Sequence, residues 1–427
     1  MKKIMEIMCV VLLAGMGAAC SLLDLHNDGD SPRKDTERND STAVEEALQY
    51  DTLIYSAGVQ FPAGYNWQVD TLTESEKGSI VLYKGEELLI SLPVGYENNI
   101  SADPDMYRII DGHLYTDYST DKETIIKKDG QEIFRYEGRE ALCGFATMDD
   151  NVWTLGQNRS GSGLCLRKNG KLVYSHPLGI IIGNTMDTYN PGGALFFIGK
   201  EPAFFFRYFS SEGPLSKVTK CYYVKGDQAT ELEVPSNFSR IMDAKFVGGL
   251  PVMAGMRGYA INMICIIRNG TSVGYTLTGF DKIGSCKITP VGDDDYYLSG
   301  ECYSAGLNTG FICDHNGQNL FIDLEGRLVG FYVCEGVDVI LSCGEFGQDP
   351  VITTNGRSKS LSGKYLYISP RCGFLLDKQF YLGLNPAEGS GPFILIGKKQ
   401  MPLNFNGFIT EVQVKVVQKQ KTEGVDD

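Results

Sequence analysis

The stretch that decides the fold is Leu164-Cys165-Leu166-Arg167-Lys168-Asn169-Gly170, a short apolar run that ends in two basic residues and an Asn-Gly pair. The same pattern recurs at Ile125-Ile126-Lys127-Lys128-Asp129-Gly130 and at Ile264-Cys265-Ile266-Ile267-Arg268-Asn269-Gly270. Asn-Gly or Asp-Gly between apolar runs is the strongest short-range signal of a β-hairpin, because these residues tolerate the positive φ of a tight turn. Each stretch therefore predicts one strand, a tight turn and the start of a second strand.

Weaker copies of this hairpin occur along the rest of the chain. They are Tyr83-Lys84-Gly85, Val224-Lys225-Gly226, His315-Asn316-Gly317, Thr354-Asn355-Gly356 and Ile396-Gly397. Successive turn glycines lie 45, 40, 56, 44, 47, 39 and 41 residues apart, which centres on the length of a four-stranded propeller blade. Strand-like runs such as 151–155 precede the hairpins. The sequence thus predicts an all-β protein, a β-propeller of eight blades by hairpin count, with seven as the alternative.

The two ends of the repeat region bear on how the ring closes. The first unit is expected to take its inner strands from residues 52–57 and 67–72. A late alternating run, 408–417, looks like one more strand that closes the ring by pairing with the N-terminal segment. Helical periodicity is confined to 42–48. A two-domain β-sandwich protein and a β-solenoid remain the competing architectures.

The N-terminus predicts export. Lys2 and Lys3 precede an apolar stretch, and Gly17-Ala18-Ala19-Cys20 follows. The stretch is too short to span a bilayer comfortably, which is typical of a signal peptide. Small residues before Cys20 resemble a lipobox, with Gly17 where a leucine is usual; secretion with cleavage near Ala19 is the alternative. We expect a signal peptide at 1–19, lipidated Cys20 and a polar tether at 20–49, the propeller at 50–417 and a disordered tail at 418–427. The predicted location is the cell envelope, in the outer membrane, with the side left open.

The hairpin signature resembles the Trp-Lys-Asn-Gly type repeats of uncharacterised Bacteroidetes lipoproteins. The resemblance covers most of residues 80–400, but Leu, Ile or Tyr stands where that family has Trp. It implies a propeller shape and an envelope location and no particular chemistry.

Charge and cysteine content exclude several classes of protein. The formal net charge is −14 without a concentrated basic patch, so nucleic acid is not an expected partner. Ten cysteines follow Cys20, mostly single residues within apolar runs, which favours buried free thiols. Disulfides between Cys302 and Cys313, or between Cys334 and Cys343, are the alternative. Without Cys-x-x-Cys pairs and with four histidines, no metal or other cofactor is expected.

Linear catalytic motifs are missing from the sequence. There is no Gly-x-Ser-x-Gly elbow, no phosphate-binding Gly-rich motif and no sialidase-type Asp-box. His113, His176 and His315 have no evident catalytic partner. The run Asp293-Asp294-Asp295 is interpreted as a solvated turn.

Propeller geometry indicates where a ligand would bind. If the glycine turns join the third and fourth strands of each blade, the loops joining the second and third strands lie on the opposite face. Those loops are 116–123, 156–163, 207–219, 255–259, 303–309 and 344–349. They would present Tyr118, Arg159, Arg207, Tyr208, Arg257, Tyr259, Tyr303, Asn308 and Glu345.

Tyrosine and arginine on one rim suit stacking against sugars or gripping an extended chain. We expect a non-enzymatic binding or scaffold lipoprotein, held to the membrane by lipid on Cys20, with a protein or glycan ligand. A polysaccharide-active enzyme with carboxylates distributed over several blades is the alternative, and a rigid spacer without a ligand is a third hypothesis.

Overall fold

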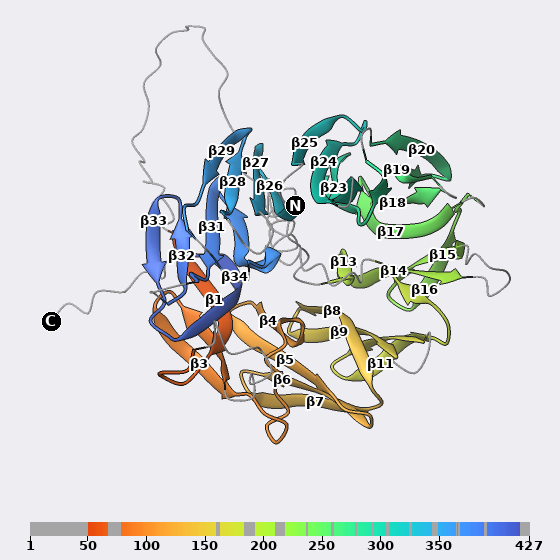
Figure 1. Ribbon diagram of the computed structural model, residues 1–427. Helices are drawn as coiled ribbons and strands as arrows, with labels where there is room; N and C mark the ends of the chain where they lie inside the picture. Colours follow the sequence, from red (N-terminus) through yellow and green to blue (C-terminus); the bar gives the residue numbers. More distant parts are fainter. Residues whose placement is uncertain are drawn as a thin grey trace, which may run out of the picture.

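The computed structural model shows an eight-bladed β-propeller (Figure 1). It describes residues 50–66, 78–158, 163–182, 193–209, 218–235, 238–257, 260–277, 280–292, 294–304, 307–323, 327–343, 349–363, 365, 368–387 and 391–418. Eight separate antiparallel sheets follow one another round a ring, so the eight-blade prediction is confirmed over the sandwich, the solenoid and the seven-bladed ring. The predicted leader, Cys20, the tether and residues 419–427 lie outside the described residues; Gln418 still belongs to the last strand.

Each blade contains four strand positions from the ring centre outward, and in blades 4 and 6 the innermost position is split into two short strands. The blades are numbered here in chain order. Blade 1 comprises β34 (Gly407–Gln418), β1 (Tyr50–Gln60), β2 (Ser79–Lys84) and β3 (Glu87–Pro93), and blade 2 comprises β4 (Tyr107–Ile110), β5 (His113–Ser119), β6 (Glu123–Lys128) and β7 (Gln131–Glu137). Blade 3 comprises β8 (Glu140–Met148), β9 (Asn151–Asn158), β10 (Leu164–Lys168) and β11 (Lys171–His176). Blade 4 comprises the split inner strand β12 (Ile180–Ile181) and β13 (Phe196–Ile198), with β14 (Glu201–Phe209), β15 (Val218–Lys225) and β16 (Gln228–Leu232).

Blades 5 to 8 follow the same plan. Blade 5 comprises β17 (Phe238–Val247), β18 (Leu250–Arg257), β19 (Ala260–Arg268) and β20 (Thr271–Thr276). Blade 6 comprises the split inner strand β21 (Lys282–Ile283) and β22 (Lys287–Val291), with β23 (Asp295–Ser304), β24 (Leu307–Asp314) and β25 (Asn319–Asp323). Blade 7 comprises β26 (Arg327–Cys334), β27 (Val337–Cys343), β28 (Val351–Thr354) and β29 (Arg357–Ser360), and blade 8 comprises β30 (Gly373–Leu376), β31 (Gln379–Leu384), β32 (Phe393–Ile396) and β33 (Lys399–Pro402). Two 3₁₀ turns, η2 (Pro104–Met106) and η4 (Pro370–Cys372), lead into β4 and β30.

The glycine turns lie where the repeat predicts, between the third and fourth strand of every blade. Asp129, Asn169, Asn269 and Asn355 have positive φ, as do the glycines that follow them, which matches a type I′ hairpin turn. The turn side chain also makes a contact of its own, because the Asn169 Oδ1 accepts from the Val152 backbone N–H at 2.9 Å. Asp129 and Asn355 make the same bond to the second residue of their own second strands. The turn thus ties the outer hairpin to the inner part of its blade.

The ring closes between the two ends of the described chain. β34 pairs with β1 along its length, from Tyr50 against Gln418 to Gln60 against Gly407, which confirms the predicted closing strand. The expectation that residues 67–72 supply an inner strand of blade 1 is wrong for that position, because β34 occupies the place next to β1; the segment itself lies outside the described residues.

The inner strands alternate between two designs. In odd-numbered blades they are long and share one bulged residue at an equivalent place, Thr410, Cys143, Met242 or Val329, and β17 has a second bulge at Ser239. In even-numbered blades they are short or split, with four residues in β4 and β30. An odd blade and the even blade after it therefore form a two-blade unit, repeated four times. We call the boundary between one unit and the next a seam.

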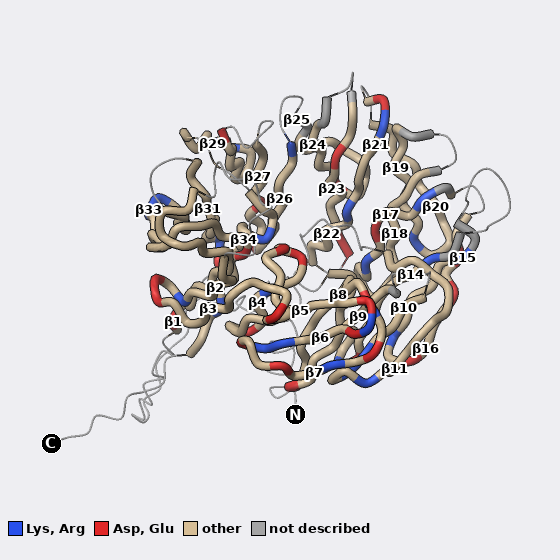
Figure 2. The backbone as a smooth tube through the Cα atoms, turned by 60° about the horizontal axis from the view of Figure 1, so that its bottom comes forward, with Lys and Arg blue, Asp and Glu red and all other residues tan. Residues whose placement is uncertain are grey.

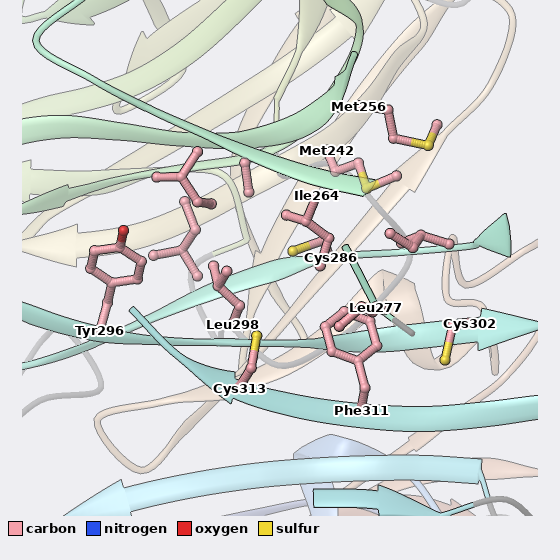
Figure 3. Close-up of a cluster of buried hydrophobic side chains, with 14 of the residues drawn as sticks. Met242, Met256, Ile264, Leu277, Cys286, Tyr296, Leu298, Cys302, Phe311 and Cys313 are labelled. Atoms are coloured by element: carbon pink, nitrogen blue, oxygen red, sulfur yellow. The ribbon is translucent and has the colours of Figure 1, made fainter. Parts of the chain in front are cut away.

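The hydrophobic core follows these units. One cluster of buried side chains lies between each pair of neighbouring blades, which makes eight clusters among the described residues. The clusters inside the units hold 12, 12, 17 and 9 residues, and those at the seams hold 5, 9, 4 and 9. Figure 3 shows the largest, between blades 5 and 6, where Leu298, Phe311 and Ile264 are fully buried. Most apolar burial is thus placed inside the two-blade units.

Nine cysteines are free thiols, and all of these except the partly buried Cys165 are buried. Cys302 pairs in register with Thr309, and Cys313 with Leu298, so these two cysteines do not face each other across their hairpin. Cys343 is also free. Neither of the two alternative disulfides forms. Burial raises the pKa of the Cys302 and Cys313 thiols to about 12, as expected for inert core residues.

Charged residues of both signs are scattered round the ring (Figure 2). Within the described part of the chain, no helix reaches the length and apolar character needed to cross a bilayer.

Candidate functional site on the loop-rich face

The two ends of the ring differ in what they expose. Because the strands of a blade are antiparallel, the eight glycine turns share one end with the turns between first and second strands. We call this end the turn face. The loops between second and third strands and the connections between blades lie at the other end, the loop-rich face. All six loops that the sequence analysis singled out join second and third strands, as predicted.

The predicted binding residues lie closer to strands than expected. Tyr118, Arg207 and Tyr303 have described side chains and belong to β5, β14 and β23, because the second strands extend further than the apolar pattern suggested. Residues that lie in strands but whose side chains are not described are Tyr208, Arg257 and Asn308. Residues outside the described part of the chain are Arg159, Tyr259 and Glu345.

Two aromatic contacts are presented on the loop-rich face. Tyr118 packs edge-to-face against Tyr96, with ring centroids 6.2 Å apart, and the Tyr96 side chain is 77% exposed. The Tyr96 backbone is fixed in a tight turn in which Gly95 bridges to Ile100. Tyr303 is 37% exposed, and the Lys282 ammonium lies 6.0 Å from its ring centre. The face thus holds exposed aromatic rings on ordered backbone.

One strand position recurs at all four seams. It is the seventh residue counted from the start of the second strand in each even blade, which we call position 7; in blade 8 this residue directly follows the strand. Its occupants are Ser119, Arg207, Glu301 and Asn385, counted from the strand starts His113, Glu201, Asp295 and Gln379. In every case the side chain bonds to the inner strand of the next odd blade. Position 7 is therefore the polar link across each seam.

The contacts made at position 7 differ in kind. The Ser119 hydroxyl donates to the Glu140 carbonyl at 2.8 Å. The Asn385 amide donates to the Ile409 carbonyl at 2.9 Å and accepts from the Ile409 N–H at 2.8 Å. The Arg207 guanidinium donates to the Ile241 carbonyl. Ile241 and Ile409 are equivalent, since each directly precedes the bulged residue of its inner strand.

A second recurring position lies close to position 7 across the seam. It is the residue two places before the bulge, which we call the facing position, and its occupants are Ala141, Arg240, Arg327 and Phe408. Between blades 6 and 7 the two positions form an ion pair, because the Arg327 Nε donates to the Glu301 carboxylate at 2.9 Å. Between blades 4 and 5 both positions are arginines.

The arginine pair has an unfavourable electrostatic setting. Burial lowers the pKa of Arg207 to about 10, and the positive charge of Arg240 adds to this effect. Arg240 is exposed, whereas Arg207 is partly buried. The two like charges therefore oppose each other.

Buried carboxylates near the ring centre have structural partners. Glu411 lies 3.5 Å from Arg371 and accepts from the Ile109 N–H of the next blade. The Asp117 carboxylate accepts from Arg108 at 3.0 Å. Burial raises the pKa of Glu411 and of Asp117, and the neighbouring arginines oppose the shift. Glu411 thus links neighbouring blades, whereas Asp117 fixes Arg108 within blade 2.

No cluster of three His, Cys, Asp or Glu side chains suited to a metal ion occurs among the described residues. A hollow of about 700 Å³ lies on the outer strands of blade 2, bordered by Lys122, Glu123, Arg135 and Tyr136. It is separate from the seam between blades 4 and 5, since all its lining residues belong to blade 2 and the segment after it.

The sequence analysis missed Tyr96, Arg240 and Asn385. One signal for the facing position was present: in every odd blade, the second-strand residue that pairs with the residue just before the bulge is small, namely Gly58, Gly156, Gly255 or Ser342. A Cβ added to Gly58 would lie 2.1 Å from the Phe408 carbonyl oxygen, and one added to Gly255 would lie 2.2 Å from that of Arg240. These glycines mark where the bulged inner strand approaches its neighbour.

No protein-family model matches the chain, and no curated protein matches it. The chain is similar to solved structures at low sequence identity. A dihydro-heme d1 dehydrogenase is 11% identical over 84% of this chain and 74% of its own, with a TM-score of 0.47. The β-propeller domain of the trilobed protease from Pyrococcus furiosus is 12% identical over 73% of this chain and 92% of its own, with a TM-score of 0.42.

The acylaminoacyl peptidase of Pyrococcus horikoshii is 13% identical, with a TM-score of 0.40. The match covers 73% of this chain and 54% of the peptidase, so this chain corresponds to about half of that enzyme. These likenesses concern the propeller fold alone.

Proposed function

We propose that the protein is a cell-envelope lipoprotein that binds a glycan through its loop-rich face without catalysing a reaction. The observation that carries the proposal is the display of exposed tyrosine rings on ordered backbone there: Tyr96 with Tyr118, and Tyr303 beside Lys282. An exposed ring that is already ordered offers a sugar a flat apolar surface at little cost in conformational entropy.

The binding role is favoured over the enzymatic alternative by the use of the buried carboxylates. Glycosidases need two carboxyl groups free to exchange protons on either side of the scissile bond. Glu411, Asp117 and Glu140 instead bond to arginine side chains, and Glu411 also bonds to backbone.

The test is a glycan array probed with the purified full chain and with a Tyr96→Ala, Tyr118→Ala, Tyr303→Ala triple variant. We expect the parent protein to bind a defined set of glycans and the triple variant to lose that binding. A matched control is Tyr50→Ala, because Tyr50 is 57% exposed and lies at the turn-face end of β1. Equal binding by parent and triple variant would reject the aromatic site, and release of shortened sugars would favour the enzyme.

The membrane anchor needs a separate test. Cells that express the chain are supplied with a labelled fatty acid, and the parent protein is expected to take up label that a Cys20→Ala variant does not. Label-free parent protein in the culture medium would indicate ordinary secretion.

A further inference from the structure

The tyrosine pair on blade 2 borders a row of side chains that leads into the hollow of that blade. Tyr118 is in register with Ile125 on β6, and Ile125 is in register with Arg135 on β7. Register partners project from the same side of a sheet, and β5, β6 and β7 lie side by side in blade 2 (Figure 1). Arg135 borders the hollow of about 700 Å³. The exposed rings and the hollow therefore lie on one side of the blade, two strand spacings or about 10 Å apart.

This side of blade 2 faces blade 1, and its backbone is held in place. Leu114 lies on the same side of β5 as the tyrosine and is buried in the cluster that blade 2 shares with blade 1. Ile125 is 1% exposed, so the row has a buried floor. The Lys127 ammonium donates to the Asn98 carbonyl, which ties the turn that carries Tyr96 to β6. A ligand would thus meet a surface that is already ordered.

The charged groups around the hollow include a fixed cluster. The Arg135 guanidinium donates two bonds to Glu123, at 2.8 and 2.9 Å, and two to Glu132, at 3.0 and 2.7 Å. Glu137 is in register with Glu123, is exposed, and is not one of these two partners. Lys122 also lines the hollow. These five side chains carry three negative charges and two positive ones, so the acids are in excess.

The chemistry of the hollow favours hydroxyl groups over anions. Ionised carboxylates accept hydrogen bonds and cannot donate them. Sugar hydroxyls donate, and a bond to a charged acceptor is stronger than one between neutral groups. A uronic acid or a sulfated sugar would instead bring a like charge to the hollow, on a chain whose formal net charge is −14.

We infer that the hollow binds a further sugar unit of the glycan that stacks on Tyr96 and Tyr118, and that this glycan is an uncharged chain. The inference rests on the proposed function for the tyrosine site. One unit lies against the exposed rings, and a unit further along the chain donates its hydroxyls to the carboxylates of Glu123 and Glu137. Arg135 is a positioning residue, because it holds the Glu123 carboxylate in place. The site would select neutral polysaccharides over polyuronates.

The experiment is a calorimetric titration of the full chain with linear hexasaccharides of glucose, galactose and mannose, and with oligouronates of the same sugars and length. At least one neutral hexasaccharide is expected to bind, and its uronate counterpart to bind about 5-fold more weakly at low salt because of the like charges. The matching monosaccharide should bind more weakly than the hexasaccharide, since it cannot reach the rings and the hollow together.

A single substitution separates the hollow from the rings. Glu137→Ala is expected to weaken hexasaccharide binding about 3-fold to 10-fold, the net strength of one hydrogen bond, and to leave monosaccharide binding unchanged. Glu87→Ala is the matched control, because Glu87 is an exposed glutamate at the turn-face start of β3, and it should bind like the parent protein. Both side chains are exposed, so both variants should melt with the parent protein.

The outcomes distinguish this inference from the proposed function. Tyrosine-dependent binding that is equal for neutral and uronate chains, or that Glu137→Ala leaves unchanged, would overturn the hollow as a site for a neutral sugar while leaving glycan binding in place. Failure of every neutral hexasaccharide to bind would overturn it as well. Loss of all tyrosine-dependent binding on the glycan array would reject the proposed function itself.

Discussion

The boundary between the two blades of a unit and the seam between two units are stabilised by different kinds of interaction. Inside a unit, an odd blade packs on the following even blade through a large apolar cluster, such as the one around Leu298 and Phe311. At a seam, the apolar cluster is smaller or equal in size, and a polar side chain at position 7 completes the contact. Burial of apolar area is the larger source of stability, so the units hold most of the folding energy.

The difference also explains where variation is tolerated. A buried cluster constrains every member by volume, because interiors are close-packed. A single hydrogen bond to a backbone carbonyl can be made by serine, asparagine or arginine, as Ser119, Asn385 and Arg207 show. The seams can therefore acquire charge and ligand specificity without altering the core of a unit.

The largest effect is expected at the seam that closes the ring, where a buried ion pair lies beside an apolar cluster of nine residues. Arg371 and Glu411 are 9% and 5% exposed there and form an ion pair between blades 8 and 1. Arg371→Ala would leave a buried carboxylate without its cation, at a cost of about 3–5 kcal/mol in the free energy of unfolding. Urea unfolding at pH 8 measures it; a loss below that of an average surface substitution would contradict the structural role of the pair.

The pH dependence of that variant has a definite sign. Burial raises the pKa of Glu411, and the charge of Arg371 lowers it. Without Arg371 the pKa in the folded state rises further, so the folded protein takes up a proton at higher pH than the unfolded chain does. The deficit in stability is therefore largest above that raised pKa and shrinks as the pH falls through it towards the ordinary range of a glutamate.

A matched pair of leucines measures the unit against the seam directly. Leu298 is fully buried in the cluster between blades 5 and 6, and Leu328 is 6% exposed in the small cluster between blades 6 and 7. Leu298→Ala is expected to cost about 2–5 kcal/mol, and Leu328→Ala less, because fewer neighbours lose contacts. Chemical unfolding of both variants provides the test. An equal or reversed order would show that cluster size does not locate the stability.

The turn side chains are expected to contribute equally to the stability of odd-numbered and even-numbered blades. Asp129 in an even blade and Asn169 in an odd blade make the same bond to the second strand, at 2.9 Å in each case. Alanine at either position loses that bond and must adopt a positive φ, for a cost of about 1–2 kcal/mol. Similar losses in thermal unfolding are expected, and a difference of several kcal/mol would mean that the turns take part in the two-blade unit.

The sequence predicted the part of this architecture that depends on local chemistry. The turns at Asn169-Gly170 and Asn269-Gly270 need positive φ, which only a few residues supply, so their spacing revealed the blades and their number. The alternation of inner strands was not visible, because a bulge at Met242 or Cys143 is set by contacts with the neighbouring blade. Arg240 was missed for the same reason, since its closeness to Arg207 depends on how two blades pack.

The smallest effect is expected at the arginine seam, when its chemistry is converted into that of the neighbouring ion-paired seam. Arg207→Glu would place the pair seen at Glu301 and Arg327 between blades 4 and 5, facing Arg240. Because one charge is exposed, the gain in stability should be no more than about 1 kcal/mol. Salt is the more telling variable: added NaCl should stabilise the parent protein by screening two like charges, and should not stabilise the variant, whose charges attract. Melting curves at low and high NaCl measure both effects. Identical salt responses of the parent protein and the variant would mean that Arg207 and Arg240 do not interact.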